Sequence, residues 1–254
     1  MTTIYHITIT CPCCGHTFQS PTWGTKNTFG TISSDLHFGS LGYDYLPLEV
    51  HTCDRCGYSL DNRELEEKDT SAYPITPELQ ERIRQQILPR IKTEFPPGAK
   101  RYEFAALISE WRGDSFCRIG EHYLKAAWCS DERREYDDAM HYRQEALIWF
   151  EKELSGNQTS PDYDRPVLLY QVGELHRRTG DTERAFYWLN QVEEAVLREG
   201  KHFWLIDLAA RQRDHPEETI EDPDSIFNDD TLGVFDRLRR RFCGIFCIYL
   251  KKMK

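Results

Sequence analysis

The sequence lacks any stretch of about 18 uncharged apolar residues, the length that a membrane-spanning helix requires. Residues 1–10 also lack the basic region, apolar core and small-residue cleavage site of a secretory leader. There is no excess of positive charge either, because 42 acidic residues outnumber 32 basic ones and the net charge is −10. We therefore expect a cytoplasmic protein, and we do not expect nucleic acid as its partner.

Common catalytic signatures are missing as well. The sequence contains no G-x-x-x-x-G-K-[ST], G-x-G-x-x-G, H-E-x-x-H or G-x-S-x-G pattern. Cys117, Cys129 and His122 fall in predicted helices, but their spacing does not place a base within reach of a nucleophile. We predict no catalytic residue and a protein that is not an enzyme.

Cysteine, in contrast, is abundant, with nine residues. The sequence has two C-x-x-C-G units, residues 11–15 and 53–57, with 38 residues between Cys14 and Cys53. In a reducing compartment such pairs favour metal over disulfides, and four thiolates suit a tetrahedral zinc ion. The glycine after each second cysteine fits a sharp turn with positive φ. We predict one structural Zn²⁺ held by Cys11, Cys14, Cys53 and Cys56.

Two alternatives remain open at this site, since Cys13 and His16 could each replace an assigned ligand. Four thiolates leave no position for water or substrate, which favours a structural ion.

Alternating apolar residues predict strands over residues 4–10 and 45–52, so the region is predicted to be a zinc ribbon with an unusually long insertion. Metal release should unfold roughly the first 60 residues.

The rest of the chain has helical periodicity. Thr76, Pro77 and Glu78 form a helix start, and Pro89 should kink or end that helix near Leu88. Short turns between the following helices imply antiparallel neighbours. The apolar stripes are Phe104, Leu107, Ile108 and Trp111; Phe116, Ile119, Tyr123 and Ala127; Ala139, Tyr142, Ala146 and Phe150; Leu168, Val172 and Leu175; and Ala185, Leu189, Val192 and Val196.

An internal repeat refines this prediction. Residues 169–189 match a tetratricopeptide repeat, with Gly173 and Ala185 at the points where two helices approach closely. A looser copy begins near Phe116, and a weak third lies around residues 203–213. We predict an α+β fold, with a small N-terminal β zinc ribbon followed by an all-α tetratricopeptide-like array of helical hairpins.

Composition divides the chain into four regions. We predict a zinc-ribbon-like domain over 1–72, a helical domain over 73–215, an acidic linker over 216–235 and a basic, apolar segment over 236–254. The last segment carries a net charge of +6. We favour a final helix docked on the acidic body; contact with a membrane surface is the alternative.

The pattern as a whole resembles an uncharacterised bacterial family, domain of unknown function 2225. The resemblance rests on Cys11–Cys14, Ser34–Leu36, Cys53–Tyr58 and the repeat from Gly173 to Ala185, and covers roughly residues 5–200. It implies a bacterial cytoplasmic protein with bound metal, and it brings no activity with it.

The function we favour is a non-enzymatic scaffold that binds a protein or peptide partner. Arg177 and Arg178 could clamp a carboxylate or an acidic peptide. One alternative is a nucleic-acid-associated regulator, although the ribbon offers few basic residues, Lys26 and Arg55 among them. The other is a metal-dependent enzyme that uses Asp35, His37 or His51 beside the ion. By resemblance to tetratricopeptide repeats, the groove-facing residues are Glu121, Lys125, Tyr170, Glu174, Arg177 and Arg178.

Overall fold

The N-terminal region consists of two antiparallel β-hairpins. In the computed structural model, which describes residues 3–25, 32–39, 44–67, 72–91, 95–156 and 163–215, β1 (Thr3–Thr10) pairs with β2 (Thr17–Thr25). The second hairpin joins β3 (Val50–Thr52) and β4 (Ser59–Asp61). Each hairpin turns through one C-x-x-C-G unit, so the two cysteine pairs lie at hairpin ends.

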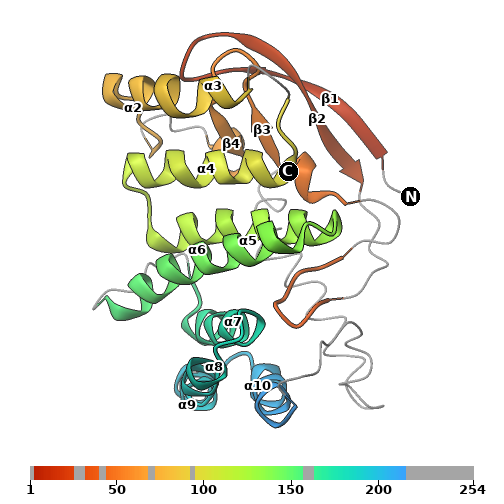
Figure 1. The fold of residues 1–254 in the computed structure, drawn as a ribbon, viewed down its shortest axis with the longest axis vertical. Coiled ribbons are helices and arrows are strands. Elements are labelled where there is room, and N and C mark those ends of the chain that lie inside the picture. The colour runs from red at the N-terminus through yellow and green to blue at the C-terminus, as the bar shows by residue number, and fades with distance from the viewer. Residues whose placement is uncertain are drawn as a thin grey trace.

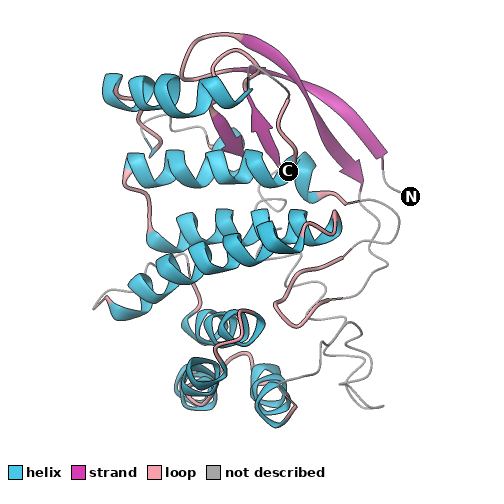
Figure 2. Ribbon diagram, in the orientation of Figure 1, coloured by secondary structure: helices cyan, strands magenta, loops and turns pink. Residues whose placement is uncertain are grey.

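Most of the remaining described chain is helical, and the predicted α+β class is confirmed (Figures 1 and 2). In Figure 1, α2, α3 and the strands form the upper layer, α4 and then α5 with α6 lie below them, and α7 to α10 form the base. The helices are α1 (Asn62–Glu66), α2 (Pro77–Arg82), α3 (Leu88–Ile91), α4 (Gly98–Arg112), α5 (Phe116–Glu132), α6 (Tyr136–Ser155), α7 (Arg165–Arg178), α8 (Thr182–Leu189), α9 (Val192–Glu199) and α10 (Trp204–Asp214).

Two local predictions need adjustment. The strand predicted over 45–52 is wrong in its first half, where a short 3₁₀ helix, Leu46–Leu48, contains Pro47. Proline fixes φ and cannot donate to a strand ladder, so pairing begins only at β3. Near Pro89 the irregularity is a π-helical turn, Ile83–Ile87, after which α3 continues through the proline.

The helix boundaries follow from ordinary capping. Gly113 and Gly180 have φ of +80° and +85° and end α4 and α7, a conformation that glycine adopts without steric cost. Asp181 then accepts a hydrogen bond from the Arg184 amide and starts α8. The stop and cap predicted at Gly180 and Asp181 are thus confirmed.

Consecutive helices pair closely at glycines. A Cβ on Gly120 of α5 would lie 2.5 Å from the Phe150 ring of α6. A Cβ on Gly173 of α7 would lie 2.7 Å from the Leu189 side chain of α8. The tight approach predicted at Gly173 is therefore confirmed, and Gly120 has the same role in the preceding helical hairpin.

Both hydrophobic cores cross from the β-hairpins into the helices. In one core, the cysteine turns pack with Tyr58 and Leu60 against α2 to α4; we call it the knuckle core, and its helical members include Ile83, Ile87, Phe104 and Ile108. In the other, Tyr45, Leu46 and Val50 join the interior of α4 to α10. The N-terminal region and the helices therefore share their apolar interior.

The predicted acidic linker, residues 216–235, and the basic segment, residues 236–254, lie outside the described residues. Of the helices that the structure describes, none combines the length and apolar character needed to cross a membrane.

Candidate metal centre and the buried polar clusters

The four predicted cysteines converge on one point. The sulfur atoms of Cys11, Cys14, Cys53 and Cys56 all lie within 4.8 Å of one another. The closest contacts join opposite hairpins, with 3.7 Å between the Sγ atoms of Cys11 and Cys56 and 3.7 Å between those of Cys14 and Cys53. Sulfurs about 2.3 Å from a tetrahedral ion are about 3.8 Å apart. The arrangement could hold one metal ion.

Both turns are built alike. The Gly15 amide donates to the Cys11 carbonyl at 2.9 Å, and the Gly57 amide donates to the Cys53 carbonyl at 2.8 Å. Their φ angles, +69° and +84°, lie in the left-handed region that favours glycine. The predicted role of both glycines is confirmed, and it explains how a two-residue spacer directs both sulfurs of a turn to the same side.

The alternative ligands lie outside the group. Cys13 is buried beside the four sulfurs, and its carbonyl accepts a hydrogen bond from Gln80 of α2. His16 pairs with Asp54, with 3.1 Å between its Nε2 and the Oδ1 atom. Hydrogen bonds from Cys11 and Cys56 hold the pKa of Cys53 well below its usual range.

A buried ionic cluster fastens the second hairpin to the helices. The Asp61 carboxylate caps α1 by accepting from the Glu64 amide at 2.9 Å, and it also accepts from Arg118 Nη2 of α5 at 3.0 Å. Burial would raise the pKa of Asp61, but Arg118, together with the weaker effects of the other neighbouring basic groups, outweighs burial and holds that pKa well below its usual range. Arg112 Nη1 donates to the Tyr58 hydroxyl at 3.0 Å. The segment after the second knuckle is thus a fixed element of the interface.

The predicted groove residues of α5 belong to this interface. Lys125 Nζ lies 3.0 Å from Glu121 Oε1, and Arg63 of α1 lies 3.4 Å from Glu121 Oε2. Burial would raise the pKa of Glu121, but Lys125 and Arg63 lower it to about 2. This face of α5 is covered by the hairpin region of the same chain.

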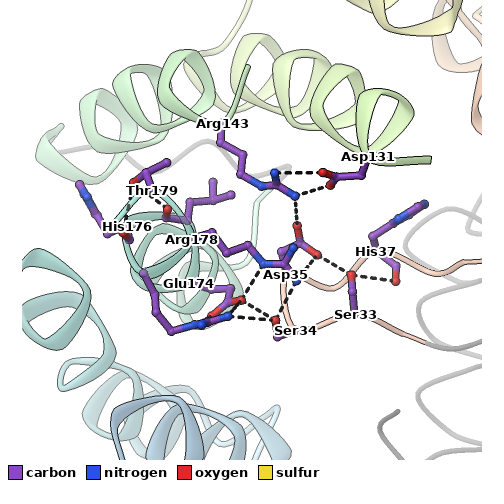
Figure 3. Close-up of polar contacts among 12 residues, drawn as sticks. Ser33, Ser34, Asp35, His37, Asp131, Arg143, Glu174, His176, Arg178 and Thr179 are labelled. Carbon is purple, nitrogen blue, oxygen red and sulfur yellow. Dashed lines mark hydrogen bonds and ion pairs between the residues drawn. The ribbon is translucent and has the colours of Figure 1, made fainter. Parts of the chain in front are cut away.

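The predicted residues of α7 face residues 32–38 of the same chain, which we call the insert segment (Figure 3). The Tyr170 hydroxyl donates to the Ser34 carbonyl at 2.7 Å. Arg178 lies 3.3 Å from Asp35 Oδ1, and it also pairs with Glu174. Arg177 Nε donates to Glu174 Oε2 at 2.7 Å. The carboxylate that Arg178 binds therefore belongs to the chain itself, and binding of a partner at these residues stays a prediction.

The residues considered for metal-dependent catalysis lie in two separate places. Asp35 and His37 belong to the insert segment, where the His37 ring stacks on Trp128 at 4.8 Å. His51 is fully buried between Ser20 of β2 and Asn62 of α1, at 2.8 Å from each. If Asn62 Oδ1 accepts from His51 Nε2, the Ser20 hydroxyl donates to Nδ1. This chain of hydrogen bonds ties β2, β3 and α1 together.

Sequence reasoning missed Trp128 and Arg143, which complete the surroundings of Asp35. Trp128 Nε1 donates to Asp35 Oδ2 at 3.0 Å, and Arg143 Nη2 lies 3.4 Å from the same oxygen. Both sit on predicted helices, where a tryptophan or an arginine gives no signal of a distant partner. Ser34 and Asp35 did stand out, through the family resemblance.

Comparison with known proteins identifies a family. The family model described as "Uncharacterized protein conserved in bacteria (DUF2225)" matches residues 4–215. No curated protein and no solved structure matches the chain. The match spans both the cysteine hairpins and the helices.

Proposed function

The chain belongs to DUF2225, a family of uncharacterized bacterial proteins, and we propose that it is a non-enzymatic adaptor. In this proposal one zinc ion stabilises the N-terminal hairpins, and the helical array binds a protein or peptide partner. The observation that carries the proposal is the closed set of four sulfurs, each provided by the protein.

A closed sulfur set supports a structural ion. Catalytic zinc sites keep a position open for water or substrate, whereas four thiolates fill the tetrahedron. All-thiolate tetrahedral sites favour zinc, since harder ions such as Mg²⁺ prefer oxygen ligands. The shared knuckle core further supports a structural role, because the cysteines Cys11 and Cys53 lie in it beside large apolar side chains.

The paired helices support an interaction role. The hairpins α5–α6 and α7–α8 meet at Gly120 and Gly173, which is the close packing that tetratricopeptide repeats use. Arrays of such hairpins present extended concave surfaces to partners.

Elemental analysis tests the metal. Protein purified without chelator should contain one zinc per chain, and cobalt substitution should give the absorption spectrum of a tetrahedral all-thiolate site. Cys53→Ser should lower the zinc content and change the cobalt spectrum, whereas Cys13→Ser is the matched control and should leave both unchanged. Absence of metal, or a cobalt spectrum that reports a bound water, would contradict the structural site.

Reciprocal purification tests the adaptor role. The tagged full chain, expressed in its own bacterium, should retain a partner in fixed stoichiometry, and that partner, tagged in turn, should recover this chain. The Cys53→Ser variant should lose the partner together with the ordered hairpins. If no protein is recovered in both directions, the adaptor function is wrong.

A further inference from the structure

The insert segment lies among polar side chains from three different helices. Asp35 is only 1% exposed, and its carboxylate contacts Trp128 of α5, Arg143 of α6 and Arg178 of α7. These helical residues are far from Asp35 in the sequence, separated by 93 positions in the case of Trp128. Figure 3 shows the carboxylate between Arg143 and Arg178. Side chains from three helices thus surround one buried carboxylate.

Ser34 is held as closely as its neighbour. Its hydroxyl donates to Glu174 Oε1 and accepts from Arg178 Nη2 at 2.9 Å, while its carbonyl accepts from the Tyr170 hydroxyl. The helices therefore contact a hydroxyl, a backbone carbonyl and a carboxylate in one dipeptide. This combination of contacts distinguishes a Ser-Asp pair from an isolated acid.

The insert segment adopts a compact turn that presents these groups. The Leu36 amide donates to the Ser33 carbonyl at 2.8 Å, and the Ser33 amide donates to the His37 carbonyl at 2.8 Å. Leu36 packs against the apolar interior, and His37 stacks on Trp128. The turn makes its polar and aromatic contacts with the helices through a short run of consecutive residues, as a bound peptide does.

Charge on the helices matches an anionic occupant. The side chains around the turn include three arginines, Arg143, Arg177 and Arg178, and two carboxylates, Asp131 and Glu174. Asp35 supplies the carboxylate that pairs with both Arg143 and Arg178. Burial would raise the pKa of Asp35, but Arg178 and Arg143 outweigh it and hold that pKa well below its usual range. Guanidinium groups also match carboxylate geometry.

Stability alone explains this arrangement poorly. Replacing a buried ion pair by apolar side chains of similar size is often neutral or stabilising, so such a pair is weak evidence for a purely structural role. Recognition of a charged group explains it directly, because each donor is already fixed in place. Arg143, for example, is held by Asp131 at the same time as it contacts Asp35.

We propose that the surface formed by Trp128, Arg143, Tyr170, Glu174 and Arg178 is a binding site for an acidic peptide with a Ser-Asp pair, which the insert segment occupies in the free protein. A partner that presents the same pair binds by displacing the insert segment. The proposal rests on the adaptor function and specifies the class of its partner. Because the occupant is tethered, it competes at an effective concentration on the order of millimolar.

A peptide-binding experiment tests the proposal. The probe is a fluorescein-labelled peptide with the sequence of residues 32–38, added to zinc-loaded full-length protein. In the first variant an equally long Gly-Ser linker replaces residues 32–38. We expect this variant to bind the probe at least about tenfold more tightly than the wild-type chain, whose own segment competes. A probe with Asn in place of Asp should lose at least about tenfold in affinity for the variant.

A second variant guards against misfolding of the first. Asp35→Asn keeps the volume of the insert segment but weakens its hold on Arg143 and Arg178, so its affinity for the probe should lie between those of the wild type and the linker variant. Adding Arg143→Met to the linker variant should reduce binding of the probe. If neither variant binds the probe, or if wild type and variants bind it equally, the inference is wrong.

The outcomes separate this inference from the adaptor function. Failure of peptide binding with reciprocal purification intact would overturn the peptide site and leave an adaptor that uses another surface. Peptide binding without any reciprocally purified partner would overturn the adaptor function, and the segment would then be only an internal contact.

Discussion

At the residue scale, Gly15 and Gly57, the glycines of the two C-x-x-C-G turns, differ in their surroundings although the two turns share one sequence pattern. Both have positive φ, but a Cβ on Gly57 would also lie 2.5 Å from Cγ2 of Ile87, whereas a Cβ on Gly15 would have nothing within 4 Å. The second knuckle is therefore pressed against the helix that contains Ile87, and the first is open. At Gly15 only the positive φ requires glycine. At Gly57 the contact with Ile87 also leaves no room for a side chain.

Alanine substitution should reveal this difference. Gly15→Ala should lower the free energy of unfolding by about 1–2 kcal/mol, the cost of a left-handed residue with a Cβ. Gly57→Ala adds overpacking, for a total of about 2–5 kcal/mol. Urea unfolding of zinc-loaded proteins measures both, and equal losses would contradict the contact with Ile87.

Buried histidines are a second residue-scale feature. Burial lowers the pKa of His37 to about 4 and that of His122 to about 3, and both therefore stay neutral in the folded chain at neutral pH. The unfolded chain takes up protons near the ordinary pKa of about 6.5, so it binds more protons than the folded chain at mildly acidic pH. Acid consequently destabilises the fold through these groups.

The free energy of unfolding should fall as the pH decreases from about 6.5 to 4, by up to about 1.4 kcal/mol per pH unit for each such histidine. Any metal held by the four cysteines would also be lost in acid, so the decisive measurement is a comparison of slopes. His37→Gln should give a shallower slope than wild type, and the exposed His141→Gln is the control that should not. Identical slopes for all three proteins would contradict neutral burial of His37.

At the element scale, glycine sets how closely the helices of a hairpin pack. Gly120 and Gly173 have ordinary helical positions, where alanine would raise helix propensity by about 1 kcal/mol. Each nevertheless faces a large side chain of the next helix, Phe150 or Leu189, at a distance that leaves no room for a methyl group. Packing and propensity therefore oppose each other at these positions.

Packing should win. Gly120→Ala should destabilise the protein by about 1–3 kcal/mol, because α5 and α6 must move apart or Phe150 must leave its rotamer. In the double variant Gly120→Ala with Phe150→Leu, the smaller partner should offset some of this loss, which gives a coupling energy of at least about 0.5 kcal/mol. Thermal or urea unfolding of the full cycle measures it, and a stabilising Gly120→Ala would show that the helices are not in contact there.

At the scale of the whole molecule, the cysteine hairpins and the helices share both hydrophobic cores and one ionic interface. Cys11 and Cys53 lie in the knuckle core with Ile83 and Ile87, and Arg118 of α5 binds Asp61 next to the second hairpin. Structural zinc contributes about 10–16 kcal/mol in small peptide domains, which exceeds what short hairpins gain from their own apolar contacts. Loss of metal should therefore extend beyond the hairpins.

Chelation should raise amide hydrogen exchange in residues 3–25, 53–61 and 77–91, the segments that meet at the knuckle core. Residues 136–154 and 192–199 should keep their protection, because they pack in the other core. The sequence alone predicts that unfolding stops near residue 60; the structure predicts that α2 and α3 follow. Exchange confined to residues before 62 would contradict this coupling.

Features that depend on residues close together in the sequence could be predicted from the sequence alone. The cysteine pairs, their glycines, the helix stop at Gly180 and the close approach at Gly173 depend on residues within one turn or at a fixed repeat spacing. The strand predicted over residues 45–52 failed in its first half because alternation there competes with Pro47, whose ring fixes φ. Such errors come from two local signals that oppose each other.

Ion pairs between residues far apart in the sequence could not be predicted in this way. Arg178 has a side chain suited to a carboxylate, and the sequence showed that much, but only the fold brings Asp35 to it from the region between the two knuckles. A single sequence specifies which groups can bind one another and, at short range, where they lie. The choice among distant partners depends on how the helices stack around the insert segment, because only that packing brings Arg143 of α6 and Arg178 of α7 to the same carboxylate.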